Sequence, residues 1–147
     1  EIGGEIVARG HNPKKEAWRI GVNKPVDDSL SMNQELQTIL QLTDVGMATS
    51  GNYRNFYYKE GRKYAHTINP KTGYPVQHNL LSTTVVAKDC MTADALATAF
   101  MVMGLEKAEA FANAHPEIEA YFIYSDEKGN FQNYFTKGMK KYIAEKQ

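Results

Sequence analysis

Alternating apolar and polar positions in the first fifty residues predict several short strands. Residues 2–9 are predicted to form a strand that begins at a Gly-Gly turn, and 17–22 alternate as a second strand. A polar turn containing Pro13 separates the two segments, so we expect them to pair as a hairpin. The apolar run 36–42 is too short for periodicity to distinguish a strand from a short helix. A further short apolar segment follows at 45–49.

The middle of the chain is rich in aromatic and β-branched residues. The aromatic segment 53–58 and the segment 63–68 are predicted to be strands that flank a turn at 59–62. Residues 69–75 contain two prolines and a glycine, which indicates a rigid loop. The run 80–87 is dense in β-branched residues and predicts a strong strand.

Helical patterning dominates after residue 90. Residues 91–103, rich in Ala, Met and Leu, predict a helix that ends at Gly104, and 105–114 predict a second helix. Because strands and helices do not alternate regularly, the pattern favours an α+β fold over a doubly wound sheet. The remaining predicted elements are strands at 118–124 and 131–135 and a polar helix at 137–145.

Composition narrows the classes of function. The 147 residues suit one domain with a real core. Seventeen Lys and Arg balance 17 Asp and Glu, so the chain lacks the excess positive charge that is expected of a nucleic-acid-binding protein. The single cysteine, Cys90, cannot form an intramolecular disulfide and is predicted to be a small buried residue. Because the chain begins at Glu1 rather than Met, we expect it to be part of a longer protein.

A carboxylate and a hydroxyl recur at helical spacing in the predicted helix 91–103. Asp94 and Thr98 are four residues apart and therefore share one helix face. Such oxygen ligands suit Mg²⁺, whose coordination is often completed by substrate phosphates. A structural explanation competes and is favoured on spacing alone, because Asp94 in a first helical turn would complement the dipole. Thr98 could likewise bond back to the preceding turn.

Three other segments carry candidate chemistry. His66, directly before the rigid loop, is a candidate base, although a lone histidine is more often a surface or packed residue. Ser50 lies in a Thr-Ser-Gly segment that could present backbone N–H groups to an anion or ring carbonyl, or form only a turn. Gly3 and Gly4 permit close backbone approach to a ligand beside Glu5, or form only a strand entry.

Aromatic side chains could stack on a flat ring, although packing is the favoured role for most of them. No GxGxxG or P-loop pattern occurs, so the common nucleotide-binding folds are not supported. The aromatic residues in question are Tyr53, Phe56, Tyr57, Tyr58, Tyr64 and Tyr74.

Taken in order, these segments resemble the ApbE family of FAD:protein FMN transferases. The family pattern runs GGEI-x-A-x-G, a Trp strand, TSG-x-Y, H-x-I-x-P-x-TG-x-P and A-D-A-x-A-T. At Asn69 family members often carry Asp, and either side chain can cap the turn. The resemblance spans the whole chain but only about the C-terminal half of the family's usual length. The matching residues are Gly3-Gly4-Glu5-Ile6 with Ala8 and Gly10, Trp18, Thr49-Ser50-Gly51 with Tyr53, His66 through Pro75, and Ala93-Asp94-Ala95 with Ala97-Thr98.

The resemblance implies a fold, a reaction and a set of site residues. The expected fold is the T-fold-like α+β architecture, an antiparallel sheet with packed helices, of which residues 1–147 form the C-terminal part. The expected reaction is Mg²⁺-dependent transfer of FMN from FAD to a Ser or Thr hydroxyl of a target flavoprotein, with release of AMP. The implied metal ligands are Asp94 and Thr98, the implied catalytic residues are His66 and Asp94, and the implied FAD-binding residues are Gly3, Gly4, Glu5, Ser50 and His66.

Other functions and the setting of the reaction stay open at this stage. Hydrolysis of FAD to FMN and AMP is one alternative, and a non-catalytic flavin-binding module is another. The Asp94 and Thr98 pair favours catalysis, because flavin binding alone would not need it. The family further implies a periplasmic or cell-envelope location with a lipid anchor in the missing N-terminal part. An exposed apolar face is expected where that part belongs, and such a face would favour a homodimer.

Overall fold

The computed structural model describes residues 1–24, 36–52, 56–59, 62–65 and 67–144, and for 56–59 and 62–65 it describes the backbone. The strands are β1 (Ile6–Ala8), β2 (Trp18–Asn23), β3 (Leu36–Leu42), β4 (Val45–Gly51), β5 (Phe56–Lys59), β6 (Arg62–Ala65), β7 (Leu80–Ala87), β8 (Glu119–Ser125) and β9 (Phe131–Phe135). The helices are α1 (Cys90–Met103), α2 (Leu105–Ala114) and a short 3-10 helix η1 (Lys137–Lys141).

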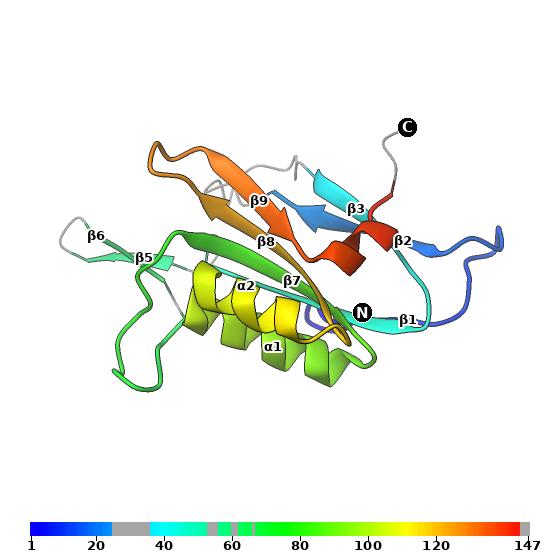
Figure 1. Cartoon of the computed structure of the whole chain (residues 1–147), viewed down its shortest axis with the longest axis horizontal. Helices are drawn as coiled ribbons and strands as arrows, with labels where there is room; N and C mark the ends of the chain where they lie inside the picture. Colours follow the sequence, from blue (N-terminus) through cyan, green and yellow to red (C-terminus); the bar gives the residue numbers. More distant parts are fainter. Residues whose placement is uncertain (25–35, 53–55, 60–61, 66, 145–147) are drawn as a thin grey trace.

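A five-stranded sheet in the order β1-β4-β7-β8-β9 forms the centre of the molecule, and every neighbouring pair is antiparallel. Helices α1 and α2 cover one face, while the β2–β3 hairpin and η1 lie on the opposite side (Figure 1). The β5–β6 hairpin projects from one end of the molecule (Figure 1). This arrangement confirms the expected α+β fold of an antiparallel sheet with packed helices.

Alternation along the central strands supplies two hydrophobic clusters. In β7, Val85 belongs to the cluster on the helix side, whereas its neighbour Val86 belongs to the cluster on the hairpin side. In β8, Phe122 and Ile123 divide in the same way. A strand that is buried on both faces needs a nearly continuous apolar or β-branched sequence, which explains the composition of 80–87.

Helix α1 lies directly against β4. Its N-cap is Asp89, whose side chain accepts a 2.8 Å hydrogen bond from the Thr92 amide. Ala93 and Ala97 are fully buried, so their small side chains allow the helix to approach the sheet closely. A Cβ atom at Gly46 of β4 would lie 2.3 Å from the backbone nitrogen of Cys90, so this contact requires glycine.

Several sequence predictions are confirmed. Helix α1 ends at Gly104, which has a φ of 78°, as predicted. The run 36–42, for which strand and short helix were both open, is a strand. The expected rigid loop is closed by a bridge between Ile68 and Pro75. Within that loop, Asn69 Oδ1 accepts a 2.9 Å hydrogen bond from the Lys71 amide, so Asn69 caps the turn.

The predicted pairing of the first two strands is wrong. Strand β1 pairs with β4, and β2 pairs with β3 in a separate two-stranded sheet. Residues 9–17 join β1 to β2, and this segment is too long for the two-residue turn that defines a tight hairpin. Pairing with β3 instead lets Val22 and Leu40 enter the hairpin-side cluster.

The predicted C-terminal helix 137–145 is wrong in type and in length, because a 3-10 helix forms over Lys137–Lys141 and residues 142–144 are not helical. Only the short η1 forms, after which Ile143 bridges to Leu40 of β3. The Gln41 amide donates to the Tyr142 carbonyl, and the Ala144 amide donates to the Ile39 carbonyl. Backbone groups that a longer helix would use internally therefore bond to β3, and Met139 is fully buried beneath this segment.

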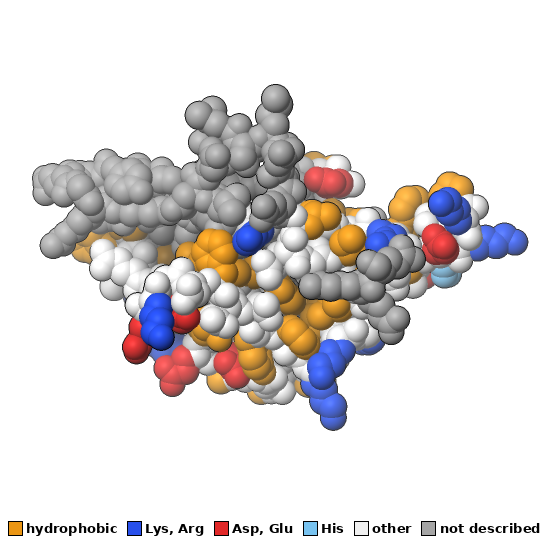
Figure 2. Space-filling view, turned by 90° about the horizontal axis from the view of Figure 1, so that it is seen from above, with side chains coloured by type: hydrophobic (Ala, Val, Ile, Leu, Met, Phe, Trp, Pro, Cys, Tyr) orange, Lys and Arg blue, Asp and Glu red, His pale blue; other side chains and the backbone are white. Residues whose placement is uncertain are grey.

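Large apolar side chains are exposed on the N-terminal elements, where Ile2 is 85% and Leu36 is 54% exposed. Seen from above, hydrophobic side chains emerge in several places among polar ones, and charged side chains gather at the lower left and the right (Figure 2). No helix in the described part of the chain is long and apolar enough to cross a membrane. A homodimer stays a prediction.

Candidate functional site

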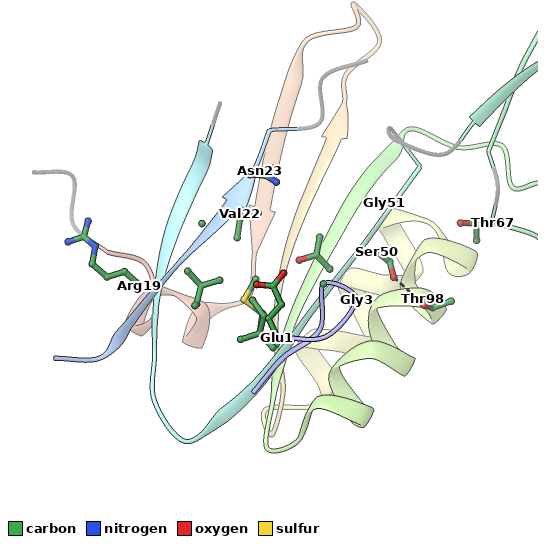
Figure 3. Close-up of a pocket in the computed structure, with 15 residues that line it drawn as sticks. Glu1, Gly3, Arg19, Val22, Asn23, Ser50, Gly51, Thr67 and Thr98 are labelled. Carbon is green, nitrogen blue, oxygen red and sulfur yellow. Dashed lines mark hydrogen bonds between the residues drawn. The ribbon is translucent and has the colours of Figure 1, made fainter. Parts of the chain in front are cut away.

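A cavity of about 600 Å³ opens between the Gly-Gly turn, strand β2 and the end of β4 (Figure 3). It brings together residues from three of the motif segments singled out in the sequence, together with one residue of the His66 loop. Its lining residues are Glu1, Gly3, Gly4, Ile6, Arg19, Ile20, Gly21, Val22, Asn23, Met47, Thr49, Ser50, Gly51, Thr67 and Thr98.

Gly3 and Gly4 form a tight turn at the cavity edge. The turn is closed by two backbone hydrogen bonds between Ile2 and Glu5, of 3.0 and 3.1 Å. Both glycines have positive φ angles, 69° and 107°, which L side chains rarely adopt. The two residues therefore present exposed backbone to the cavity, and the sequence expectation of close approach is compatible with this geometry.

The hydroxyl groups of Ser50 and Thr98 meet across the boundary between β4 and α1. Their oxygen atoms are 3.1 Å apart, and the two side chains point toward each other (Figure 3). Thr98 is exposed and Ser50 is half-buried, so both are accessible from the cavity. Asp94 is exposed one helical turn before Thr98. The predicted face that carries Asp94 and Thr98 is thus turned outward rather than packed in the core.

The two structural explanations offered for Asp94 and Thr98 do not match the geometry. Helix α1 begins at Cys90, so Asp94 lies beyond the first turn, and the capping carboxylate is Asp89. The Thr98 hydroxyl contacts Ser50 of the neighbouring strand. Sequence reasoning missed Asp89, although an Asp just before an Ala-rich helical run is a recognisable N-cap signal.

Oxygen donors at this face suit a hard divalent cation. Asp94 supplies a carboxylate and Thr98 a hydroxyl, both outward-facing on the same helix. Within the described ranges, no group of three or more His, Cys, Asp or Glu side chains is placed to hold a metal ion. The two residues fit part of a Mg²⁺ site, in which substrate phosphates and other groups complete the coordination.

Cys90 lies near this site without the properties of a nucleophile. It is half-buried at the first position of α1, and its Sγ lies 3.8 Å from the Met47 carbonyl oxygen. Burial raises the pKa of the Cys90 thiol, and the nearby carboxylates of Glu5 and Asp94 raise this pKa further. Because the thiolate is the reactive form, this environment favours a structural role for the thiol.

The structure does not test the roles predicted for Glu5 and His66. Glu5 is half-buried outside the cavity lining, and its carboxylate lies beneath Gly3, where an added Cβ would be 2.8 Å from Oε2. His66 lies outside the described residues, whereas its neighbour Thr67 lines the cavity and donates a 2.7 Å hydrogen bond to Asn52 Oδ1. The proposed roles of Glu5 and His66 stay predictions.

Among the aromatic residues considered for stacking, the structure describes the side chain of Tyr74. Tyr74 is 74% exposed, so the packing role favoured for most of the set does not apply to this residue. Tyr53 and the side chains of Phe56, Tyr57, Tyr58 and Tyr64 lie outside the described part of the chain.

One wall of the cavity was not anticipated. Residues 19–23 of β2 line it, including Arg19, whose side chain points away from the other lining residues (Figure 3), and Gly21. A cation and a glycine inside an otherwise apolar strand were the available signal, since strand glycines often mark close approach of another group. The sequence alone did not reveal that this strand lines a cavity together with the end of β4.

Comparisons with known proteins agree with the fold and the motifs. The ApbE family model matches residues 1–122. The FAD:protein FMN transferase of Vibrio cholerae is 41% identical over 144 residues, which make up 98% of this chain and 41% of that protein. The FAD:protein FMN transferase of Haemophilus influenzae is 40% identical over 129 residues, 88% of this chain and 36% of that protein. The chain spans about two fifths of the length of these curated relatives.

Solved structures give the same result in three dimensions. The flavin transferase ApbE from Vibrio cholerae superimposes with a TM-score of 0.78 at 40% identity, covering 97% of this chain and 43% of that one. The ApbE protein from Thermotoga maritima also gives a TM-score of 0.78, at 28% identity, covering 99% of this chain and 44% of that one. The family model matches residues 1–122, the relative and the solved structure from Vibrio cholerae each match nearly the whole chain, and the chain belongs to the ApbE family.

Proposed function

We propose that this chain carries the cation- and pyrophosphate-binding part of an FAD:protein FMN transferase. The relatives named above are FAD:protein FMN transferases, and a related structure is a flavin transferase. The observation that carries the proposal is the position of Thr98, which lines the cavity and lies one helical turn after the exposed Asp94. Turnover therefore depends on Mg²⁺ held by the Asp94 carboxylate and the Thr98 hydroxyl.

The reaction assigns a distinct task to each group. The hydroxyl oxygen of a Ser or Thr on the target flavoprotein attacks the FMN phosphorus of FAD, the phosphoanhydride bond breaks, and AMP leaves. Bound Mg²⁺ would neutralise the charge that builds on the phosphates as this bond breaks. The backbone at Gly3 and Gly4 admits the substrate closely, because neither residue has a side chain to obstruct it. His66 is the proposed acceptor of the hydroxyl proton or, alternatively, a flavin contact.

Replacement of Asp94 by Ala tests this assignment. In the intact protein, with FAD, Mg²⁺ and an acceptor flavoprotein, we expect FMN attachment to fall by more than about 100-fold, since even outer-shell partners of a metal contribute about 10- to 100-fold. In-gel flavin fluorescence and the mass of the acceptor measure the attachment. Circular dichroism should be unchanged, because Asp94 is exposed.

Glu127→Ala is the matched control, since this variant also removes an exposed carboxylate, in the β8–β9 turn. The control should transfer FMN at the wild-type rate. Wild-type transfer by Asp94→Ala, or wild-type transfer in the presence of a chelator, would remove the metal assignment. Release of free FMN and AMP without labelling of the acceptor would instead identify an FAD pyrophosphatase.

We further propose, from the family resemblance, that the reaction takes place on the periplasmic or cell-envelope side of the membrane through a lipid-anchored protein. Fractionation of cells that express the intact protein tests the location. Recovery of the protein in the cytosolic fraction would contradict the proposal.

A further inference from the structure

The contact between Ser50 and Thr98 places a second hydroxyl directly behind a proposed metal ligand. A threonine hydroxyl has one hydrogen to donate and lone pairs to share. If a lone pair of Thr98 faces a cation, its hydrogen must point elsewhere, and Ser50 Oγ, 3.1 Å away, is the neighbouring oxygen that can accept it. We propose that Ser50 is a positioning residue, which accepts the Thr98 hydrogen and so turns the Thr98 lone pairs toward the cation. This inference rests on the proposed function.

Strand β4 is suited to this task because it packs along α1, and two of its contacts with the helix mark the ends of this packing. The first is Gly46, whose Cα closely approaches the backbone of Asp89 and Cys90 at the start of the helix. The second is the Ser50 and Thr98 pair. Four strand residues separate the two points on β4, which is about 13 Å at about 3.3 Å per residue. Eight helical residues separate them on α1, about 12 Å at about 1.5 Å per residue.

The span of β4 between the two contacts is about as long as the span of α1 between them. The strand and the helix can therefore lie side by side and make both contacts at once. The alanines at 93 and 97 are buried against the sheet, and Asp94 and Thr98 each follow one of them. One residue corresponds to a rotation of about 100° around the helix. The proposed ligands therefore lie on the stripe beside the buried one, exposed but held by the same packing.

A direct contact between Ser50 and FAD is the competing role, since Ser50 lines the cavity. The two roles affect different quantities. A direct contact contributes to FAD binding whether or not metal is present. A positioning hydrogen bond contributes to metal affinity, and only while Thr98 retains its hydroxyl group. Measuring Mn²⁺ affinity with and without the Thr98 hydroxyl, together with metal-free FAD binding, distinguishes the two roles.

The first experiment measures Mn²⁺ binding to the intact protein by electron paramagnetic resonance of the free ion, at saturating FAD. For Ser50→Ala we expect a dissociation constant for Mn²⁺ about tenfold higher than wild type, in the range of metal outer-shell partners. Ser50→Thr restores the hydroxyl and should return the constant close to wild type. Thr83→Val is the matched control, because it removes a different sheet-to-α1 contact, the 3.4 Å bond to Met101 Sδ. It should bind Mn²⁺ as wild type does.

The second experiment repeats Ser50→Ala in a Thr98→Val background. If Ser50 acts through Thr98, the second change should add nothing to the loss caused by Thr98→Val. Equal losses in both backgrounds, or weaker metal-free FAD binding with unchanged Mn²⁺ affinity, would overturn the positioning role. The proposed function fails separately, if wild type binds no Mn²⁺ in the presence of FAD or if Asp94→Ala binds it normally.

Discussion

The two faces of the central sheet share the strands β4, β7 and β8, but the elements that cover them come from different parts of the chain. The helix-covered face draws most of its cluster from the continuous stretch 80–122, in which β7, α1, α2 and β8 follow one another. The hairpin-covered face combines β1, β2, β3 and β4 with side chains of β7 and β8, with Met139 and with residues near the C-terminus. The cavity lies at the meeting point, with Thr98 from the first group and residues 19–23 from the second. The proposed metal ligands thus rest on locally connected structure, whereas the opposite wall depends on distant contacts.

The largest effect on stability is expected in the helix-side cluster. Phe100 is fully buried, and its ring centroid lies 5.7 Å from those of Phe111 and Phe122. Phe100→Ala should lower the free energy of unfolding by about 3–5 kcal/mol through lost burial and a residual cavity. Urea denaturation measures this change. Phe131→Ala, at a phenylalanine that is 41% exposed, is the control and should cost far less. Similar losses in the two variants would contradict the assigned core.

A smaller effect, restricted to the other face, is expected at Met139. This side chain is fully buried in the hairpin-side cluster, and Met139→Ala should cost about 2–3 kcal/mol of unfolding free energy. Hydrogen exchange should accelerate in β2 and β3 before it changes in α1. Met139→Leu keeps the volume and should behave nearly as wild type. Equal acceleration in α1 and β3 would show that the two faces do not respond separately.

The smallest effect is expected at the N-cap of α1, and it depends on pH. Hydrogen bonds from the Thr92 backbone amide and then from its hydroxyl lower the pKa of Asp89 below the ordinary value of 3.8. A lowered folded-state pKa means that the ionised cap stabilises the fold above 3.8, and that this contribution is lost as pH falls through the lowered pKa. Asp89→Ala should therefore lower the melting temperature slightly at neutral pH.

The difference in melting temperature between Asp89→Ala and wild type should shrink as the pH falls below 3.8. Asp89→Asn keeps an acceptor without the charge and serves as the control, so its deficit should be smaller at neutral pH. A deficit for Asp89→Ala that is constant at all pH values would mean that the charge of Asp89 contributes nothing.

The same division between local and distant contacts explains how far the sequence predicted the fold. Both main helices and the strand 80–87 were predicted, because helical composition, Gly104 and β-branched residues are local signals. The pairing of β2 with β3 and the strand-like contact of Ile143 were not predicted. Those features depend on packing across the sheet, and no short turn sequence indicates them.

The sequence likewise predicted individual residues of the candidate site but not the distant contacts between them. The sequence singled out Ser50 and Thr98 separately, but their 48-residue separation hid the contact between their hydroxyls. Gly46 carried no visible signal, because its importance comes from the helix backbone that lies against it. Arg19 was missed since its strand was expected in a different pairing.

The hydrogen bonds that the C-terminal residues make to β3 have a consequence for solubility. Residues 36–42 form an uncharged segment, rich in Leu, without proline. Such a strand is prone to pair with other chains when its edge is open. One edge of β3 is occupied by β2, and on the other the backbone of Tyr142 and Ala144 bonds to Gln41 and Ile39. The backbone of residues 142–144 thus protects this edge of β3 from pairing with other chains.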